Sequence, residues 1–164
     1  MAAGSRRRSR IIAFQALYEA DQSEHTLAAV LARLLAEAAL APKASAFVEQ
    51  LVLGVDARRE EIDAMIAERA SAFPLTAMAP VDRNVLRLAL FEICFDNHRA
   101  PLAIVINEAV DLAKGYGSAS SGRFVHGVLG AIAGRQQAQD EVGARTEVAR
   151  SAAPKATAPP RAAE

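Results

Sequence analysis

The sequence predicts an all-α protein in which six to seven helices form two packed subdomains. From about residue 6 to residue 135 the apolar residues recur at spacings of three and four, the pattern of helices with one buried face. Alanine supplies 38 of the 164 residues, whereas the chain has six Phe, two Tyr and no Trp. The interior is therefore expected to be aliphatic and closely packed. No segment sustains the alternation of apolar and polar residues that a half-buried strand requires.

The N-terminal subdomain is expected over about residues 6–73 and should contain three helices. Ser5 is predicted to cap the first helix and Thr26 to mark the start of the second, because short hydroxyl side chains accept hydrogen bonds from a first turn. The second helix is expected to end before Pro42. Ser45 is predicted to cap a third, longer helix that continues to the end of the subdomain.

Gly54 lies inside the predicted third helix. Glycine in a helix interior costs about 1 kcal/mol relative to alanine. We therefore expect either close packing against another helix or a bend at this position. Beyond this helix, the segment from Phe73 to Pro80 is predicted to connect the two subdomains.

The C-terminal subdomain is expected over about residues 80–135 and should also contain three helices. The first starts near Pro80 and is apolar on two sides, which predicts a central position in the fold. The second starts after Pro101 and ends at Gly115–Gly117. The third follows the polar loop Ser118–Ser121.

The C-terminal end of the chain differs in composition from the rest. After Arg135 the apolar period ends, and Ala, Pro, Thr and single charges remain. Such a composition cannot bury enough apolar surface to offset the entropy of the chain. The sequence therefore predicts one helical domain over residues 1–135 and a disordered tail over residues 136–164.

The charges are unevenly distributed although the formal net charge is zero. Residues 1–18 carry four arginines and no acidic side chain, whereas residues 19–134 carry ten basic and fifteen acidic side chains. A neutral protein with one basic end is expected to contact a polyanion locally.

The sequence contains no motif of an enzyme, a metal site or a cofactor site. It lacks a Gly-rich phosphate loop and a His-Glu-x-x-His pair, and its single Cys94 excludes an internal disulfide or a cysteine cluster. No apolar run reaches the length of a membrane span, and the basic N-terminus lacks the apolar stretch of a signal peptide. We therefore expect a cytoplasmic protein without enzymatic activity, cofactor, metal or membrane attachment.

An arginine cluster at the start of the first helix is the strongest candidate for a binding site. Its guanidinium groups belong to Arg6, Arg7, Arg8 and Arg10. Arginine suits phosphate because its planar fork donates two parallel hydrogen bonds. Gln15 and Tyr18 follow on the same helix and offer an amide for a base edge and a ring for an unstacked base, as single-stranded RNA requires. The alternative is a solvated basic terminus without a ligand.

The mainly apolar helix that starts near Pro80 also carries charged residues, among them Arg83, Arg87 and Glu92. Arg83 and Arg87 are expected to be solvated or weakly ion-paired. Glu92 stands among apolar residues and needs a partner, because a buried carboxylate without one is costly.

Four sequence blocks in order resemble the NusB transcription antitermination factor family. They are Arg6–Arg10 with Gln15–Tyr18, Val81–Glu92, Val105–Lys114, and Gly117 with Arg123–Leu129. Together they cover roughly residues 6–135. One departure is His126, which stands where the family usually has Asn.

The resemblance implies an all-helical protein that binds the boxA element of nascent RNA together with NusE, a ribosomal small-subunit protein. The complex helps RNA polymerase to read through terminators, notably in ribosomal RNA operons. The resemblance assigns RNA contacts to the arginine cluster with Gln15 and Tyr18, and to a second region with Ser120, Arg123 and Phe124. For Phe124, core packing is an equal alternative. The resemblance assigns a contact with NusE to Asp82, and self-association as a homodimer stays open.

Two other functions compete with this interpretation. The chain could be a helical protein-interaction module whose arginines touch no RNA. It could also be an RNA-binding accessory related to the NusB-like domains of ribosomal RNA cytosine methyltransferases. Methyl transfer by the chain itself would require a cofactor-binding βαβ pattern and a cysteine nucleophile, which the sequence does not show.

Overall fold

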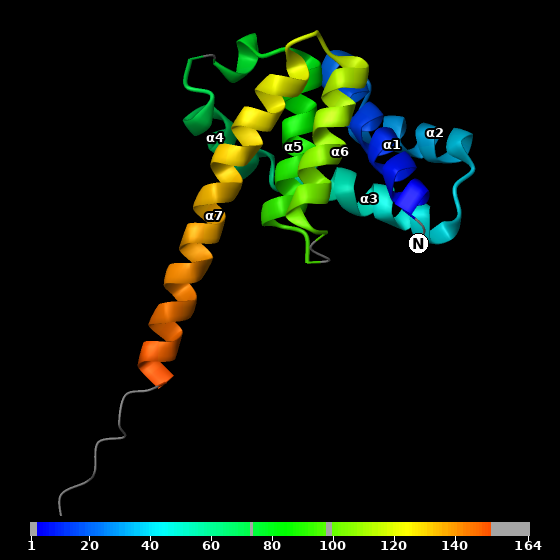
Figure 1. The fold of residues 1–164 in the computed structure, drawn as a ribbon. Helices are drawn as coiled ribbons and strands as arrows, with labels where there is room; N and C mark the ends of the chain where they lie inside the picture. Colours follow the sequence, from blue (N-terminus) through cyan, green and yellow to red (C-terminus); the bar gives the residue numbers. More distant parts are fainter. Residues whose placement is uncertain (1–2, 73, 98–99, 152–164) are drawn as a thin grey trace, which may run out of the picture. The chain divides into compact units, whose positions relative to one another are not determined.

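A computed structural model describes residues 3–72, 74–97 and 100–151 of the chain. All regular structure in these ranges is helical, which confirms the predicted all-α class. The elements are α1 (Ala3–Gln22), α2 (Leu27–Ala38), α3 (Pro42–Ala57), α4 (Arg59–Arg69), the 3-10 helix η1 (Leu75–Ala77), α5 (Pro80–Cys94), α6 (Leu102–Tyr116) and α7 (Ser121–Ser151) (Figure 1).

Helix starts follow the sequence signals in some places and not in others. The Thr26 hydroxyl accepts a hydrogen bond from the Ala29 N–H and caps α2, as predicted. The prediction that Ser5 caps the first helix is wrong, because α1 already includes Ala3. The prediction for Ser45 is also wrong: α3 begins at Pro42, whose fixed φ suits the first turn of a helix.

The predicted long third helix is divided into α3 and α4 at Arg58. Arg58 adopts φ −112° and ψ 15°, outside helical geometry. Val55 and Ile62 lie on either side of the break and are both fully buried. Residues seven positions apart also lie on the same face of a continuous helix, so the apolar pattern of the sequence does not reveal the break.

At Gly54, α3 packs closely against Phe91 of α5, which confirms one of the two predictions made for this glycine. A Cβ atom at this residue would lie only 2.1 Å from Cζ of Phe91 on α5. The ring therefore occupies the space that any larger side chain would need. The bend of the chain occurs four residues later, at Arg58.

We expect Gly54→Ala to destabilise the chain by about 1–3 kcal/mol, because Phe91 must move within a packed core. Gly127→Ala is the matched control, since this glycine also lies in a helix but has nothing within 4 Å of its added Cβ. Alanine should be neutral or stabilising there. Urea denaturation of both variants measures the difference, and equal stability would contradict the packing role of Gly54.

Helix α5 is the centre of the fold. It contacts α1, α3, α4 and α6, and every residue from Asp82 to Glu92 except Arg83 is buried. This confirms the central position that its two-sided apolarity predicted. The buried apolar side chains of both predicted subdomains, from Ile12 to Ile132, belong to one hydrophobic cluster. The division at residues 73–80 therefore stays a prediction.

Helix α7 continues to Ser151, beyond the point where the apolar period ends. Residues 136–151 are thus helical, whereas their composition predicted disorder. Ala, Gln, Glu and Arg are frequent in this stretch and have high helix propensity, which explains helix without an apolar stripe. Residues 152–164 of the predicted tail lie outside the described residues. Contacts divide the chain into two units, residues 1–133 and 134–164.

A polar cluster joins the end of α1 to α4 and α5. The Asp21 carboxylate accepts hydrogen bonds from Arg83 at 2.6 and 3.2 Å, from Asn84 at 2.9 Å and from Arg87 at 3.4 Å. Arg87 also donates to both oxygens of Asp63 on α4, at 2.7 and 2.9 Å. The expectation that these two arginines are solvated or weakly paired is wrong, because both are largely enclosed by this cluster.

Candidate nucleic-acid interface

Three arginines at the start of α1 are exposed: Arg6, Arg7 and Arg8. Arg7 forms ion pairs with α6, at 3.2 Å to Asp111 and 3.7 Å to Glu108. Arg8 donates to the Ala38 carbonyl at 2.9 Å. Exposed pairs of this kind contribute at most about 1 kcal/mol. All three guanidiniums are therefore available to an anionic ligand.

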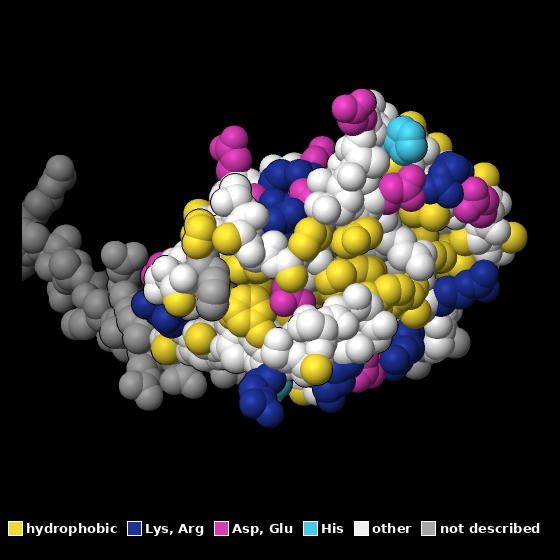
Figure 2. All heavy atoms as spheres, turned by 90° about the horizontal axis from the view of Figure 1, so that it is seen from above, with side chains coloured by type: hydrophobic (Ala, Val, Ile, Leu, Met, Phe, Trp, Pro, Cys, Tyr) yellow, Lys and Arg dark blue, Asp and Glu magenta, His cyan; other side chains and the backbone are white. Residues whose placement is uncertain are grey.

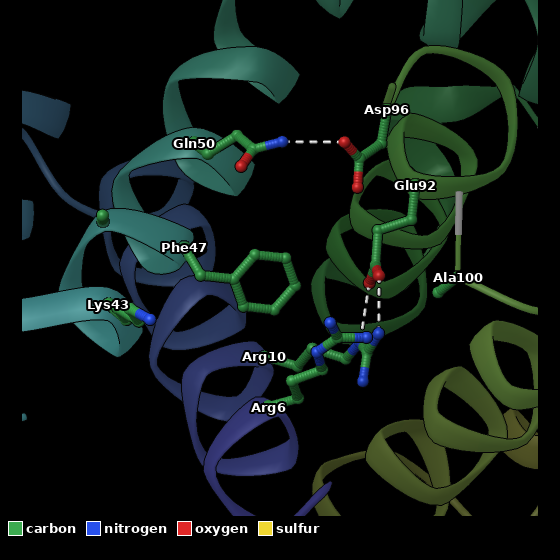
Figure 3. A pocket seen from close by; sticks show the side chains of 9 residues that line it. Arg6, Arg10, Lys43, Phe47, Gln50, Glu92, Asp96 and Ala100 are labelled. Carbon is green, nitrogen blue, oxygen red and sulfur yellow. Dashed lines mark hydrogen bonds and ion pairs between the residues drawn. The ribbon is translucent and has the colours of Figure 1, made fainter. Parts of the chain in front are cut away.

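Arg6 differs from its two neighbours. It has no hydrogen-bonding partner among the residues that the structure describes. It lies beside Arg10 at the edge of a cavity of about 250 Å³ between α1, α3 and α5, which Lys43 also lines (Figure 3). Arg6 from α1 and Lys43 from α3 therefore both line the same cavity.

Arg10 does not belong to the exposed strip. Its side chain is 5% exposed and donates to both oxygens of Glu92, at 2.8 and 2.7 Å, as Figure 3 shows. Burial lowers the pKa of Arg10, but the hydrogen bonds and charge of Glu92 outweigh burial and raise it. The expectation that Arg10 contacts RNA is wrong, because its guanidinium is buried in an ion pair with Glu92. Arg10 is thus the partner that the buried carboxylate of Glu92 was expected to need.

Tyr18 and Gln15 lie further along α1. Arg7 and Tyr18 are eleven residues apart, which places them on nearly the same side of the helix and about 16 Å apart along its axis. Tyr18 is 37% exposed. The structure thus brings one exposed cation and one exposed ring onto one side of α1.

Tyr116 joins this arrangement from the end of α6. Its ring centroid lies 5.1 Å from that of Phe14, and the ring centroid of Tyr18 lies 5.9 Å from that of Phe14. Tyr116 is 46% exposed. Tyr116 was not among the predicted site residues, although its place between two glycines at a helix end is a signal in the sequence.

The second predicted region begins two residues after Tyr116. Ser118 and Ser121 close the turn, with the Ser118 N–H donating to the Ser121 hydroxyl at 2.9 Å. Ser120 and Arg123 are exposed. Phe124 is half-buried and packs against the hydrophobic core, which favours the packing alternative over RNA stacking.

Asp82 lies in the first turn of α5 and is only 8% exposed. Its Oδ1 atom is buried without a hydrogen-bonding partner in the described part of the chain. The first turn of a helix favours a negative charge. The helix dipole of α5 therefore favours the charge of Asp82, but the hydrogen-bonding capacity of its Oδ1 atom is not satisfied.

Other kinds of site are not found among the described residues. No group of three or more His, Cys, Asp or Glu side chains in these ranges could hold a metal ion. No described helix combines the length and the apolar character that crossing a membrane would require.

Comparison with known proteins identifies the family. The NusB family matches residues 7–134, which is most of the chain. The chain belongs to the NusB family. Curated relatives include the transcription antitermination protein NusB of Chloroflexus aggregans, 42% identical over 140 residues and covering 85% of this chain and 93% of the relative. The NusB of a Roseiflexus species is 45% identical over 134 residues, with 81% and 94% coverage.

Solved structures agree with this assignment. A NusB structure from T. maritima matches this NusB-family chain with a TM-score of 0.73 and 35% identity, over 78% of this chain and 89% of that one. A structure of NusB and NusE in complex with dsRNA matches with a TM-score of 0.74 and 28% identity, over 82% and 99% of the two chains. The family resemblance inferred from four sequence blocks is confirmed.

Proposed function

We propose that this NusB-family chain is a cytoplasmic, non-enzymatic transcription antitermination factor that binds boxA-type RNA of nascent transcripts together with NusE. The observation that carries the proposal is the side of α1 on which the exposed Arg7 and Tyr18 lie together, with Arg6 and Arg8 beside Arg7. The curated relatives are named transcription antitermination proteins. A similar structure contains NusB, NusE and dsRNA.

In the proposed complex, the three exposed arginines hold phosphates and position the RNA. Tyr18 offers a face for one base, and Gln15 offers an amide for a base edge. Ser120 and Arg123 extend the contact from the turn before α7, where a hydroxyl and a guanidinium suit sugar and phosphate. Phe124 supports this turn from within the core.

The proposed contact with NusE includes Asp82. Asp82 is 8% exposed, and its buried Oδ1 has no hydrogen-bonding partner among the described residues, so its carboxylate favours a partner that brings a hydrogen-bond donor or a cation. Such a complex would join RNA polymerase in the antitermination assembly. Asp82→Asn should weaken NusE binding while leaving the affinity for RNA alone unchanged.

The salt dependence of RNA binding tests the proposal. Three phosphate contacts to a single strand predict a slope of about −2 for log K against log[salt], which is an affinity loss of about twentyfold between 50 and 200 mM salt. The variant Arg6→Ala/Arg7→Ala/Arg8→Ala should lose most of this slope. Fluorescence anisotropy with a labelled boxA oligonucleotide measures both quantities.

Arg58→Ala is the control, because Arg58 is similarly exposed but lies at the junction of α3 and α4. It should retain the slope and affinity of the wild type. If the triple variant binds RNA as the wild type does at every salt concentration, the three arginines do not contact RNA. The chain would then be the helical protein-interaction module, an alternative that the internal partners of Arg7 and Arg8 favour.

A further inference from the structure

A groove of about 560 Å³ runs between the C-terminal half of α1, α2 and the ends of α5 and α6. Its lining includes Phe14, Tyr18, Leu34, Val81 and Tyr116 as apolar or aromatic residues. Figure 2 looks down on the ends of α5 and α6 and shows hydrophobic side chains gathered in a hollow between acidic and basic ones. The groove is thus an aromatic recess within a charged surface.

We propose that this groove takes an unpaired base of single-stranded RNA and that Tyr116 is a base-stacking residue beside Tyr18. The inference rests on the proposed function and extends it to a residue and a recess that the family resemblance did not assign. Stacking on aromatic side chains is the general means by which proteins hold unpaired bases.

The two tyrosine rings are held in place but remain accessible. Phe14 is 2% exposed and contacts both of them, with interplanar angles of 37° to Tyr18 and 50° to Tyr116. Neither tyrosine ring therefore lies parallel on Phe14. More than a third of Tyr18 and nearly half of Tyr116 stay exposed. A buried ring thus fixes two exposed rings on neighbouring helices.

The polar lining suits a base better than a phosphate. The only basic residue that lines the groove within the described part of the chain is Arg33, and its charge is met by Glu19 and Glu37. Gln15 also lines the groove, and its amide has no hydrogen-bonding partner among the described residues. An amide carries both a donor and an acceptor, which is what a base edge requires.

The groove lies within reach of a strand that contacts the exposed arginines. Arg7 stands about 16 Å from Tyr18 along the same side of α1, so one strand can place a phosphate on Arg7 and a base in the recess. Tyr116 is also the last residue of α6, directly before the turn that carries Ser120. It therefore stands between the two predicted RNA-facing regions.

The composition of the chain allows a direct test. Its two tyrosines, Tyr18 and Tyr116, both line the groove. Full-length protein labelled with 3-fluorotyrosine should give one ¹⁹F NMR resonance for each, and Tyr18→Phe assigns them. Adding a single-stranded boxA oligonucleotide should shift both resonances. An RNA-dependent shift of Tyr18 with no change at Tyr116 would overturn the inference.

Affinity measurements provide the second readout. Tyr116→Ala should weaken binding of the same oligonucleotide about tenfold, whereas Tyr116→Phe keeps the ring and should bind as the wild type does. Leu53→Ala is the matched control, because Leu53 is another large side chain that is 54% exposed but does not line the groove. Circular dichroism checks that each variant retains its helix content.

The outcomes separate this inference from the proposed function. If RNA binds in an arginine-dependent manner but Tyr116→Ala retains full affinity, the base recess is wrong and the proposed function stands. If purified NusE alone shifts the Tyr116 resonance and RNA does not, the groove serves a protein, which overturns the inference. If no RNA binds at any salt concentration, both proposals fail.

Discussion

Replacing Arg10 with alanine is expected to destabilise the folded chain by about 3–5 kcal/mol. The substitution leaves the carboxylate of Glu92 buried in the core, 2% exposed, without the two hydrogen bonds that now satisfy it. It also removes the guanidinium from its position over the Phe47 ring, at 5.7 Å. Urea denaturation monitored by circular dichroism measures the loss.

Two further variants control this prediction. Arg10→Met/Glu92→Leu removes both charges and should recover most of the lost stability, because apolar residues of similar volume replace buried ion pairs at little cost. Arg6→Ala, four residues earlier on the same helix, should change stability by less than about 0.5 kcal/mol. If Arg10→Ala kept full stability and lost RNA affinity instead, Arg10 would be an RNA contact after all.

Removing the Asp21 carboxylate should have the second largest effect, about 2 kcal/mol for Asp21→Ala. Arg83, Asn84 and Arg87 all donate to this side chain, and each loses an acceptor at once. The substitution also removes these hydrogen bonds between the end of α1 and α5. Glu24→Ala is the control, because Glu24 is an exposed acidic residue only three positions away.

The same carboxylate makes stability dependent on pH. Burial raises the pKa of Asp21, but hydrogen bonds from Arg83 and Asn84 outweigh burial and lower it below its usual value. A carboxylate with a lowered pKa in the folded state contributes its full stability above its unfolded pKa of about 3.9. This stability should be lost as the pH falls below that value, and Asp21→Asn should reduce the loss. An identical acid transition in both proteins would contradict the role of Asp21.

Much of the fold could be predicted because it depends on local signals. Apolar spacing gave the helices and the central place of α5, and Pro42, Pro80 and Pro101 stand where helices start. The break at Arg58 was not predicted, because the buried face continues in phase across it. The helix over residues 136–151 was not predicted either, because intrinsic propensity can form a helix in a segment that has no apolar face.

The candidate RNA-binding site was less predictable, because arginines that are close in sequence can differ in how much of the side chain is exposed. Arg10 shares the spacing of four and seven with Phe14 and Leu17, which placed it on the buried face of α1 and not with its arginine neighbours. Glu92 stood on an apolar helix and needed a partner. Two isolated charges on two apolar faces were therefore a signal for an ion pair, but only the fold identifies them as partners.

Tyr116 and Asp21 show a second limit. Each acquires its role through contacts with residues far away in sequence, Tyr116 with Phe14 and Asp21 with Arg83 and Arg87. No spacing rule connects such positions. They become visible only once the helices are packed together.

The ion pairs between Arg7 and the carboxylates of Asp111 and Glu108 have a consequence for ligand exchange. Those carboxylates are intramolecular competitors of phosphate, since both are anions that bind the same guanidinium. In the proposed RNA complex, Arg7 would exchange these carboxylates for a phosphate, whereas Arg6 would gain a partner. Of these two neighbouring arginines, Arg6 should supply the larger net gain in affinity.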